Sequence, residues 1–214
     1  MSWPFNSYPK IKSNQSGLTL VELIVVITIV TIMTAIVMSN LPAFRSKIEL
    51  DLIAQEVAIT IRQAQAFGAA SRGGLDTANF GLNFKRDDGT GGARAPGFST
   101  THFVLFGDKD GDHKFEGDAG PGVCDNECVE VFEFRGGVSI TNIQDGGDNT
   151  IGHQYLSIMP RPPQHEMAFY GYNSGSGNVD ALSAVGKIRI TISRGSDYRY
   201  VYVWNTGHIY VSKE

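Results

Sequence analysis

The sequence predicts an α+β fold in which one long N-terminal helix, a membrane half followed by an amphipathic half, packs on an antiparallel β-rich head. In this 214-residue chain the apolar residues concentrate before residue 40, and an amphipathic helical pattern follows to about residue 73. The rest is rich in Gly, Asn, Asp and Ser with short runs of Val, Ile, Tyr and Phe, which favours strands and turns. We therefore divide the chain into a leader at 1–17, a membrane helix at 18–41, an amphipathic helix at 42–73 and a β-rich head at 74–214.

Residues 1–17, MSWPFNSYPKIKSNQSG, form a short polar leader with two lysines and no acid. A secretory signal peptide places its apolar region before the cleavage site, whereas here the small residue Gly17 precedes the apolar segment. A helix over residues 18–38 rises about 1.5 Å per residue and reaches about 30 Å, the thickness of a bilayer core. By the positive-inside rule Lys10 and Lys12 place the leader in the cytoplasm, so the sequence predicts a single-pass membrane protein with its head outside the cytoplasm.

Glu22 lies inside this apolar segment, where an unpaired carboxylate is costly. Cleavage after Gly17 would create an α-amino group on Leu18, four residues away on the same helix face. A carboxylate in the first turn also complements the positive end of the helix dipole. Neither effect accounts for the depth of the acid, whereas the N-terminal amine of a neighbouring copy does, so we expect a pairing between subunits.

Residues 17–23, GLTLVEL, resemble the cleavage and methylation motif of type IV prepilins and type II secretion pseudopilins. The resemblance implies that prepilin peptidase cuts between Gly17 and Leu18, that Leu18 is then N-methylated, and that Glu22 neutralises the amine of an adjacent subunit in a helical filament. It implies other pilin or pseudopilin subunits and an inner-membrane assembly platform as partners, with the subunit held in the inner membrane before assembly. Leu18 stands where phenylalanine is commonest in these families.

Pro42 lies just beyond the apolar run, and a proline inside a helix removes a hydrogen bond, so we expect the helix to bend or restart near residue 40. An apolar stripe with helical spacing follows, and we expect it to pack on a sheet. Its members are Leu50, Ile53, Val57, Ile61 and Ala64. Glycines at 73 and 74 are expected to end this helix.

Seven runs in the head predict strands: ANFGLNF, THFVLFG, VEVFEFRG, VSITNI, EMAFYGY, KIRITIS and YRYVYVW. Turn residues at 194–197 and 205–207 make the end of the chain a three-stranded meander. This arrangement resembles the GspH/FimT-type minor pseudopilins, in which a spine helix packs on a β-rich pilin head. Residues 203–209, VWNTGHI, fit the turn with which the C-terminal strands of those proteins end, and AFYGYNSGSGN fits their aromatic and glycine-rich hairpin.

The stretch FGDKDGDHKFEGDAG offers several hard oxygen ligands to calcium from one turn. Its acidic residues are Asp108, Asp110, Asp112, Glu116 and Asp118. It is not an EF-hand, because His113 and Ala119 stand where that loop has glycine and glutamate. The alternative is a solvated acidic turn without metal, since Asp and Gly favour turns for backbone reasons alone. Close by, Cys124 and Cys128 are expected to form a disulfide in an oxidising compartment, and further ligands for zinc lack the usual spacing.

Tyr198, Tyr200, Tyr202 and Trp204 alternate along one predicted strand and therefore line one face of it. We expect this face to pack in the core or against a neighbouring subunit. Aromatic residues next to cations also bind single-stranded nucleic acid, and this meander holds three arginines: Arg189, Arg194 and Arg199. The net charge of −4 opposes a nucleic-acid coat, so DNA binding is kept as the alternative function.

No catalytic constellation is found: the five histidines are scattered without a metal-ligand pattern, and no nucleophile elbow or phosphate-binding glycine motif is present. The sequence thus predicts a non-enzymatic structural subunit, a minor pilin or pseudopilin of a type IV pilus or type II secretion pseudopilus. The alternative is a minor pilin that captures DNA for uptake.

Overall fold

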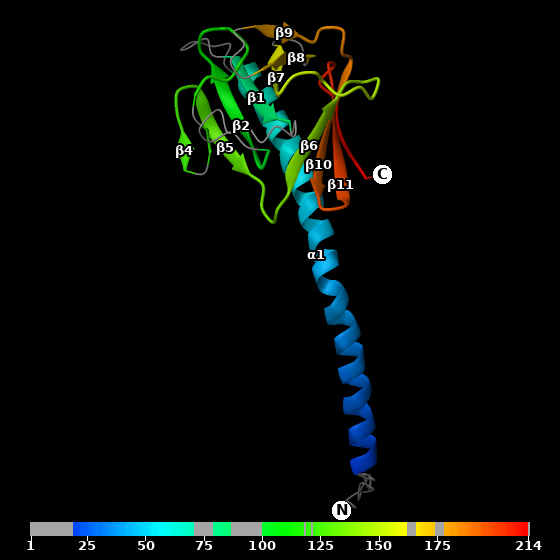
Figure 1. The fold of residues 1–214 in the computed structure, drawn as a ribbon. Helices are drawn as coiled ribbons and strands as arrows, with labels where there is room; N and C mark the ends of the chain where they lie inside the picture. Colours follow the sequence, from blue (N-terminus) through cyan, green and yellow to red (C-terminus); the bar gives the residue numbers. More distant parts are fainter. Residues whose placement is uncertain are drawn as a thin grey trace, which may run out of the picture. The chain divides into compact units, whose positions relative to one another are not determined.

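The computed structural model describes residues 19–70, 79–86, 100–117, 119–120, 122–161, 166–173 and 178–213. The chain divides into two compact units, Met1–Ala43 and Phe44–Glu214, which are described separately below. Figure 1 shows the long helix α1 and the strands of the second unit. The α+β class with a β-rich head, predicted from the sequence, is confirmed.

Helix α1 runs from Leu20 to Ala70 and contributes residues to both units. It continues through Pro42, so of the predicted bend or restart near residue 40 the restart does not occur. The proline removes one backbone N–H donor from the helix. The turns on either side keep their hydrogen bonds and hold the proline in the helix. The predicted ends of the leader and of the amphipathic helix lie outside the described residues.

The strands of the second unit form two larger sheets and one small one. The six-stranded sheet has the order β5-β2-β1-β7-β8-β9, the four-stranded sheet the order β12-β11-β10-β6, and β3 pairs with β4. All recorded pairs are antiparallel. The strands are β1 (Asn79–Lys85), β2 (His102–Asp108), β3 (Ala119–Gly120), β4 (Val123–Cys124), β5 (Cys128–Glu133), β6 (Ser139–Gln144), β7 (Tyr155–Arg161), β8 (Glu166–Tyr172), β9 (Val179–Ala181), β10 (Lys187–Arg194), β11 (Asp197–Trp204) and β12 (Ile209–Ser212).

The main core of the second unit lies between α1 and both larger sheets, where the cyan part of the helix passes in Figure 1. The predicted apolar stripe faces this core, and each of its members is at most 5% exposed. Ile188, Ile190 and Ile192 of β10 meet it from the four-stranded sheet, which gives that strand its alternation of buried and half-buried residues. Burial of these apolar side chains is the main force that holds helix and sheets together.

A second apolar cluster covers the other face of the six-stranded sheet. Every residue of β2 is buried. Phe103 and Leu105 point into the main core, and Val104 and Phe106 point into the second cluster. Phe115, from the loop after β2, packs into the second cluster and contacts the ring of Phe106 edge-on at 5.8 Å between centroids. The acidic loop singled out in the sequence is therefore anchored to the sheet by an aromatic side chain.

Candidate functional site

Three surfaces are of functional interest, and the first is the N-terminal part of α1. The side chains from Leu20 to Met38 are exposed, and a window of 18 residues in this helix has a mean hydropathy of 2.7. By length and composition it is the one helix among the described residues that is suited to cross a membrane. Such an exposed apolar surface is stable only in lipid or against other apolar helices.

The polar groups of this segment are satisfied within it. Thr28, Thr31 and Thr34 each donate a hydroxyl hydrogen bond of 2.8 Å to the carbonyl four residues earlier. Thr19 caps the helix, since its Oγ1 accepts a hydrogen bond of 3.3 Å from the backbone N–H of Glu22. Polar atoms that are paired inside the segment carry a small desolvation cost in lipid.

The Glu22 carboxylate is the exception. Within the described part of the chain, no hydrogen bond or ion pair engages it. Gly17 and Leu18, where the sequence places the cleavage site, lie outside the described residues. The arrangement thus presents one unpaired acid in the first turn of an otherwise apolar, internally satisfied helix, which a cation from outside the described segment can neutralise.

The second surface is the acidic loop after β2. The Asp108 carboxylate is buried and organises the turn: it accepts hydrogen bonds of 2.7 Å from the N–H of Gly111 and 3.2 Å from that of His113. Nδ1 of His113 lies 3.2 Å from the same carboxylate, and its ring stacks on Tyr170. His113 has a φ of 66°, so a residue other than glycine adopts the left-handed backbone here. These contacts hold it in that conformation.

Glu127 joins this loop to the cysteine pair and was not predicted from the sequence. It is 3% exposed, and its carboxylate accepts hydrogen bonds of 2.8 Å from the N–H of Lys109 and 2.9 Å from that of Glu116. Burial raises the pKa of the Glu127 carboxyl above its usual range. Cys124 and Cys128 form a disulfide with a Cα separation of 5.2 Å, and Glu127 lies within the short segment that this bond closes. The disulfide therefore holds in place the acid that clamps both ends of the loop.

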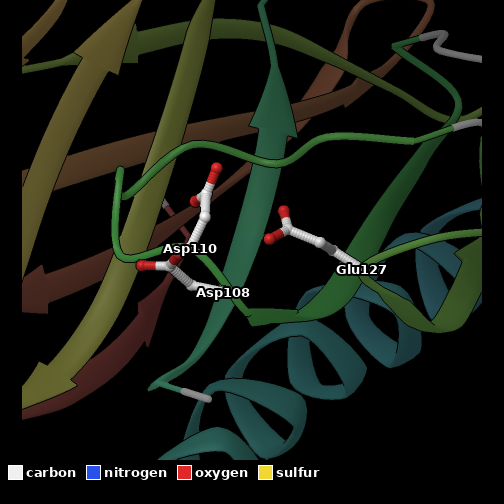
Figure 2. Close-up of side chains that lie close together, drawn as sticks. All are labelled: Asp108, Asp110 and Glu127. Atoms are coloured by element: carbon white, nitrogen blue, oxygen red, sulfur yellow. The ribbon is translucent and has the colours of Figure 1, made fainter. Parts of the chain in front are cut away.

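Two groups of three carboxylates have oxygens within 4.8 Å of one another: Asp108, Asp110 and Glu127, and Asp110, Asp112 and Glu116. Figure 2 shows the first group: Asp108 at the end of β2, Asp110 in the loop that follows, and Glu127 in the segment before β5. In the second group Nζ of Lys114 lies 2.6 Å from Asp112 and 2.5 Å from Glu116. Two of the three acids therefore already form ion pairs with a lysine of the loop. Asp118 lies outside the described residues. Calcium binding by this loop stays a prediction.

The third surface is the meander of β10, β11 and β12. The four aromatic residues of β11 lie on the face opposite Val201 and Val203, which are buried in the core, so this face is not a core face. Neighbouring rings are 5.3 to 6.1 Å apart, and Nζ of Lys187 lies 5.1 Å from the centroid of Tyr202. Tyr198 is exposed and the other three aromatic residues are half-buried, and the neighbouring-subunit interpretation stays a prediction.

All three arginines of this meander have acidic partners. Nη1 of Arg189 lies 3.0 Å from Asp148, and Nη1 of Arg194 lies 2.5 Å from Glu49. Arg199 is 7% exposed and pairs with Asp51. Two of the three cations thus join the four-stranded sheet to α1, and each is neutralised by an acid of the chain itself. The structure does not bring them together as an open cationic surface.

Comparison with known proteins gave one match. Residues 12–38 match a family model described as the prokaryotic N-terminal methylation motif. No curated protein and no solved structure matches the chain. The matched residues contain the predicted cleavage site, Glu22 and the whole exposed apolar segment from Leu20 to Met38.

Proposed function

We propose that this chain, which carries the N-terminal motif that marks type IV prepilin-like proteins, is a structural subunit of a type IV pilus or type II secretion pseudopilus. Prepilin peptidase removes residues 1–17, the new N-terminus on Leu18 is methylated, and the subunit enters a filament through its N-terminal helix. The observation that carries the proposal is the coincidence of the motif match with an exposed, internally satisfied apolar helix that contains one unpaired acid.

Glu22 sets the register of assembly in this account. Its carboxylate accepts the charged N-terminal amine of a neighbouring subunit, and the pairing offsets the cost of placing both charges among apolar helices. The exposed side chains from Leu20 to Met38 supply the packing surface. Removal of the carboxylate would leave a buried amine without a partner, which is why a single acid carries so much of the assembly energy.

The head lies outside the cytoplasm in this account. The Cys124–Cys128 disulfide supports that topology, because disulfides persist in oxidising compartments and are rare in the cytosol. The lysines of the leader favour the same orientation. A single-pass anchor with the leader inside and the head outside keeps the subunit in the inner membrane until an assembly platform transfers it to the filament.

We further propose a minor rather than a major subunit, on the resemblance of the head to the GspH/FimT-type minor pseudopilins. Supporting features are the C-terminal meander and the large, loop-rich head. DNA capture is the weaker candidate, because the arginines that would bind phosphate are already paired with acids.

Processing is tested by co-expression of the chain with a prepilin peptidase and by mass measurement of the isolated subunit. We expect the mature N-terminus to be Leu18 with one added methyl group. Gly17→Leu should block cleavage because the peptidase needs a small residue, whereas the neighbouring Ser16→Ala should be cleaved normally. A subunit that retains residues 1–17 in the presence of active peptidase would contradict the proposal.

A further inference from the structure

A groove of about 710 Å³ lies between the head half of α1 and β5, the first strand of the six-stranded sheet. Glu49, Leu52, Ile53 and Glu56 form the helix wall, and residues 130–135 form the strand wall. All of these residues belong to the unit Phe44–Glu214. Binding at this head groove would be a function beyond the proposed role in filament assembly.

Among the described residues, no strand forms a ladder with the outer edge of β5, although β3 and β4 lie near this strand. The N–H of Phe134 donates to the carbonyl of Thr101, and Phe132 lies opposite Phe103 in the same register, so these residues form their backbone hydrogen bonds with β2. In an antiparallel pair the residues between them direct their backbone groups to the opposite side. The N–H and C=O groups of Val131 and Glu133 therefore point away from β2, and no described strand pairs with them. Such an edge is a template for another strand.

The floor of the groove is apolar. Phe132 stacks on Phe103 with ring centroids 4.9 Å apart, and Phe132 and Phe134 are both half-buried at the border of the main core. Leu52 on the facing helix is 64% exposed. Apolar side chains of an added strand would find contacts here that water cannot supply.

The rim of the groove is acidic. Glu49 is held by Arg194, but within the described residues no ion pair or hydrogen bond engages the carboxylates of Glu56, Glu130 and Glu133. Arg135 is the one cation among the residues that line the groove. The site thus combines unpaired backbone groups, an apolar floor and a surplus of negative charge.

We propose that this groove binds an extended segment of a partner protein in which apolar residues alternate with lysine or arginine. The segment adds a strand to β5 by hydrogen bonds to the backbone of Val131 and Glu133. Its apolar side chains lie over Phe132 and Phe134. Its lysines or arginines pair with Glu133 on the opposite face of β5 and with Glu56 and Glu130 at the rim.

A second copy of this chain does not match that chemistry. The other terminal strands of the larger sheets are β9 (VDA), β6 (SITNIQ) and β12 (IYVS), and none contains lysine or arginine. The strands of the small sheet, AG and VC, contain none either. No strand edge in the described part of the chain therefore complements the charge of the groove, which is why the occupant is assigned to another protein.

The test measures binding of a fluorescent peptide of alternating valine and lysine to the full-length chain in detergent, by anisotropy at low salt. Val131→Pro removes an outward N–H and spares the bonds to β2, and proline is accepted on strand edges. Val131→Ala, the matched control, keeps that N–H. We expect binding by the wild-type chain and by Val131→Ala, at least a tenfold loss in Val131→Pro, and no binding of a backbone N-methylated peptide.

A second variant keeps the backbone intact, in case the proline disturbs folding. Replacement of Glu56, Glu130 and Glu133 together by glutamine preserves shape and removes three charges. At the usual strength of exposed ion pairs this should raise the Kd about tenfold and flatten its salt dependence.

Four outcomes would overturn the inference. They are no peptide binding at low salt, equal binding by Val131→Pro, equal binding of a glycine–lysine peptide that lacks the apolar residues, and self-association of the full chain that Val131→Pro abolishes. The third outcome would show an acidic surface without strand addition, and the fourth would make a second copy the occupant.

Discussion

Arg199 of β11 is almost fully buried and its guanidinium hydrogen-bonds the carboxylate of Asp51 in α1. Nζ of Lys213 lies 3.1 Å from the other oxygen of the same carboxylate. This pairing joins the four-stranded sheet to the helix at the edge of the core. Arg199, a candidate phosphate ligand in the DNA-binding alternative, therefore has a structural role.

Loss of this pairing should destabilise the head. In Arg199→Leu the Asp51 carboxylate loses its main partner, and we expect the free energy of unfolding to fall by about 1–2 kcal/mol. Chemical denaturation of the purified chain measures the change. Arg62→Leu, which alters an exposed arginine of the same helix, is the control and should change stability by less than about 0.5 kcal/mol. Equal stability of wild type and Arg199→Leu would refute the structural role.

The same pair predicts a pH dependence. The hydrogen bond from Arg199 lowers the pKa of the Asp51 carboxyl below its usual value of 3.8. A carboxyl whose pKa is lowered by folding stabilises the folded state above the unfolded-state pKa, and that stabilisation is lost as the pH falls through the folded-state pKa. The difference in stability between wild type and Asp51→Asn should therefore be constant near neutral pH and shrink below about pH 4. A difference that instead grows with acidity would contradict this assignment.

Glu127 should be sensitive to replacement, because its buried carboxylate accepts hydrogen bonds from both ends of the loop. Glu127→Ala leaves the N–H groups of Lys109 and Glu116 without their acceptor, and we expect unfolding to become easier by about 2 kcal/mol. Glu130→Ala removes an exposed acid three residues away in β5 and serves as the control, with an expected change of less than about 0.5 kcal/mol. Thermal unfolding followed by circular dichroism distinguishes the two. A Tm for Glu127→Ala equal to that of the control would show that the carboxylate does not clamp the loop.

DNA binding is expected to be absent. Because each of the three meander arginines is paired with an acid, a gel-retardation experiment at low salt should show no shift of single- or double-stranded DNA. Salt-dependent retardation that is lost in Arg189→Gln and Arg194→Gln would instead favour the DNA-uptake function. Both arginines are half-buried, so these substitutions should not disturb the core.

The periodic parts of the fold could be predicted from the sequence, because burial determines them residue by residue. The apolar stripe of α1 and the alternation of β10 both face the core as expected. β7 was missed although it lies in the middle of a sheet, because Pro160 argues against a central strand. The structure accommodates this proline because pairing with β1 ends at Ile158, so its missing N–H leaves no bond unmade on that side.

The candidate sites were predictable only where the chemistry lies in neighbouring residues. The motif around Glu22 is local in sequence, and so is the short loop between Cys124 and Cys128. Glu127 was missed because its partners, the N–H groups of Lys109 and Glu116, are distant in sequence and are backbone groups with no side-chain signal. The acidic partners of the arginines were missed for the same reason, since Asp51 and Arg199 meet only when helix and sheet pack.

The central claim is that a neighbouring subunit's N-terminal amine neutralises Glu22, and the most direct measurement is the amount of processed subunit in sheared filaments. We expect Glu22→Ala to be cleaved after Gly17 yet absent from filaments, and Thr34→Ala, a control in the same apolar segment, to assemble like the wild type. Normal incorporation of Glu22→Ala into filaments would contradict the account.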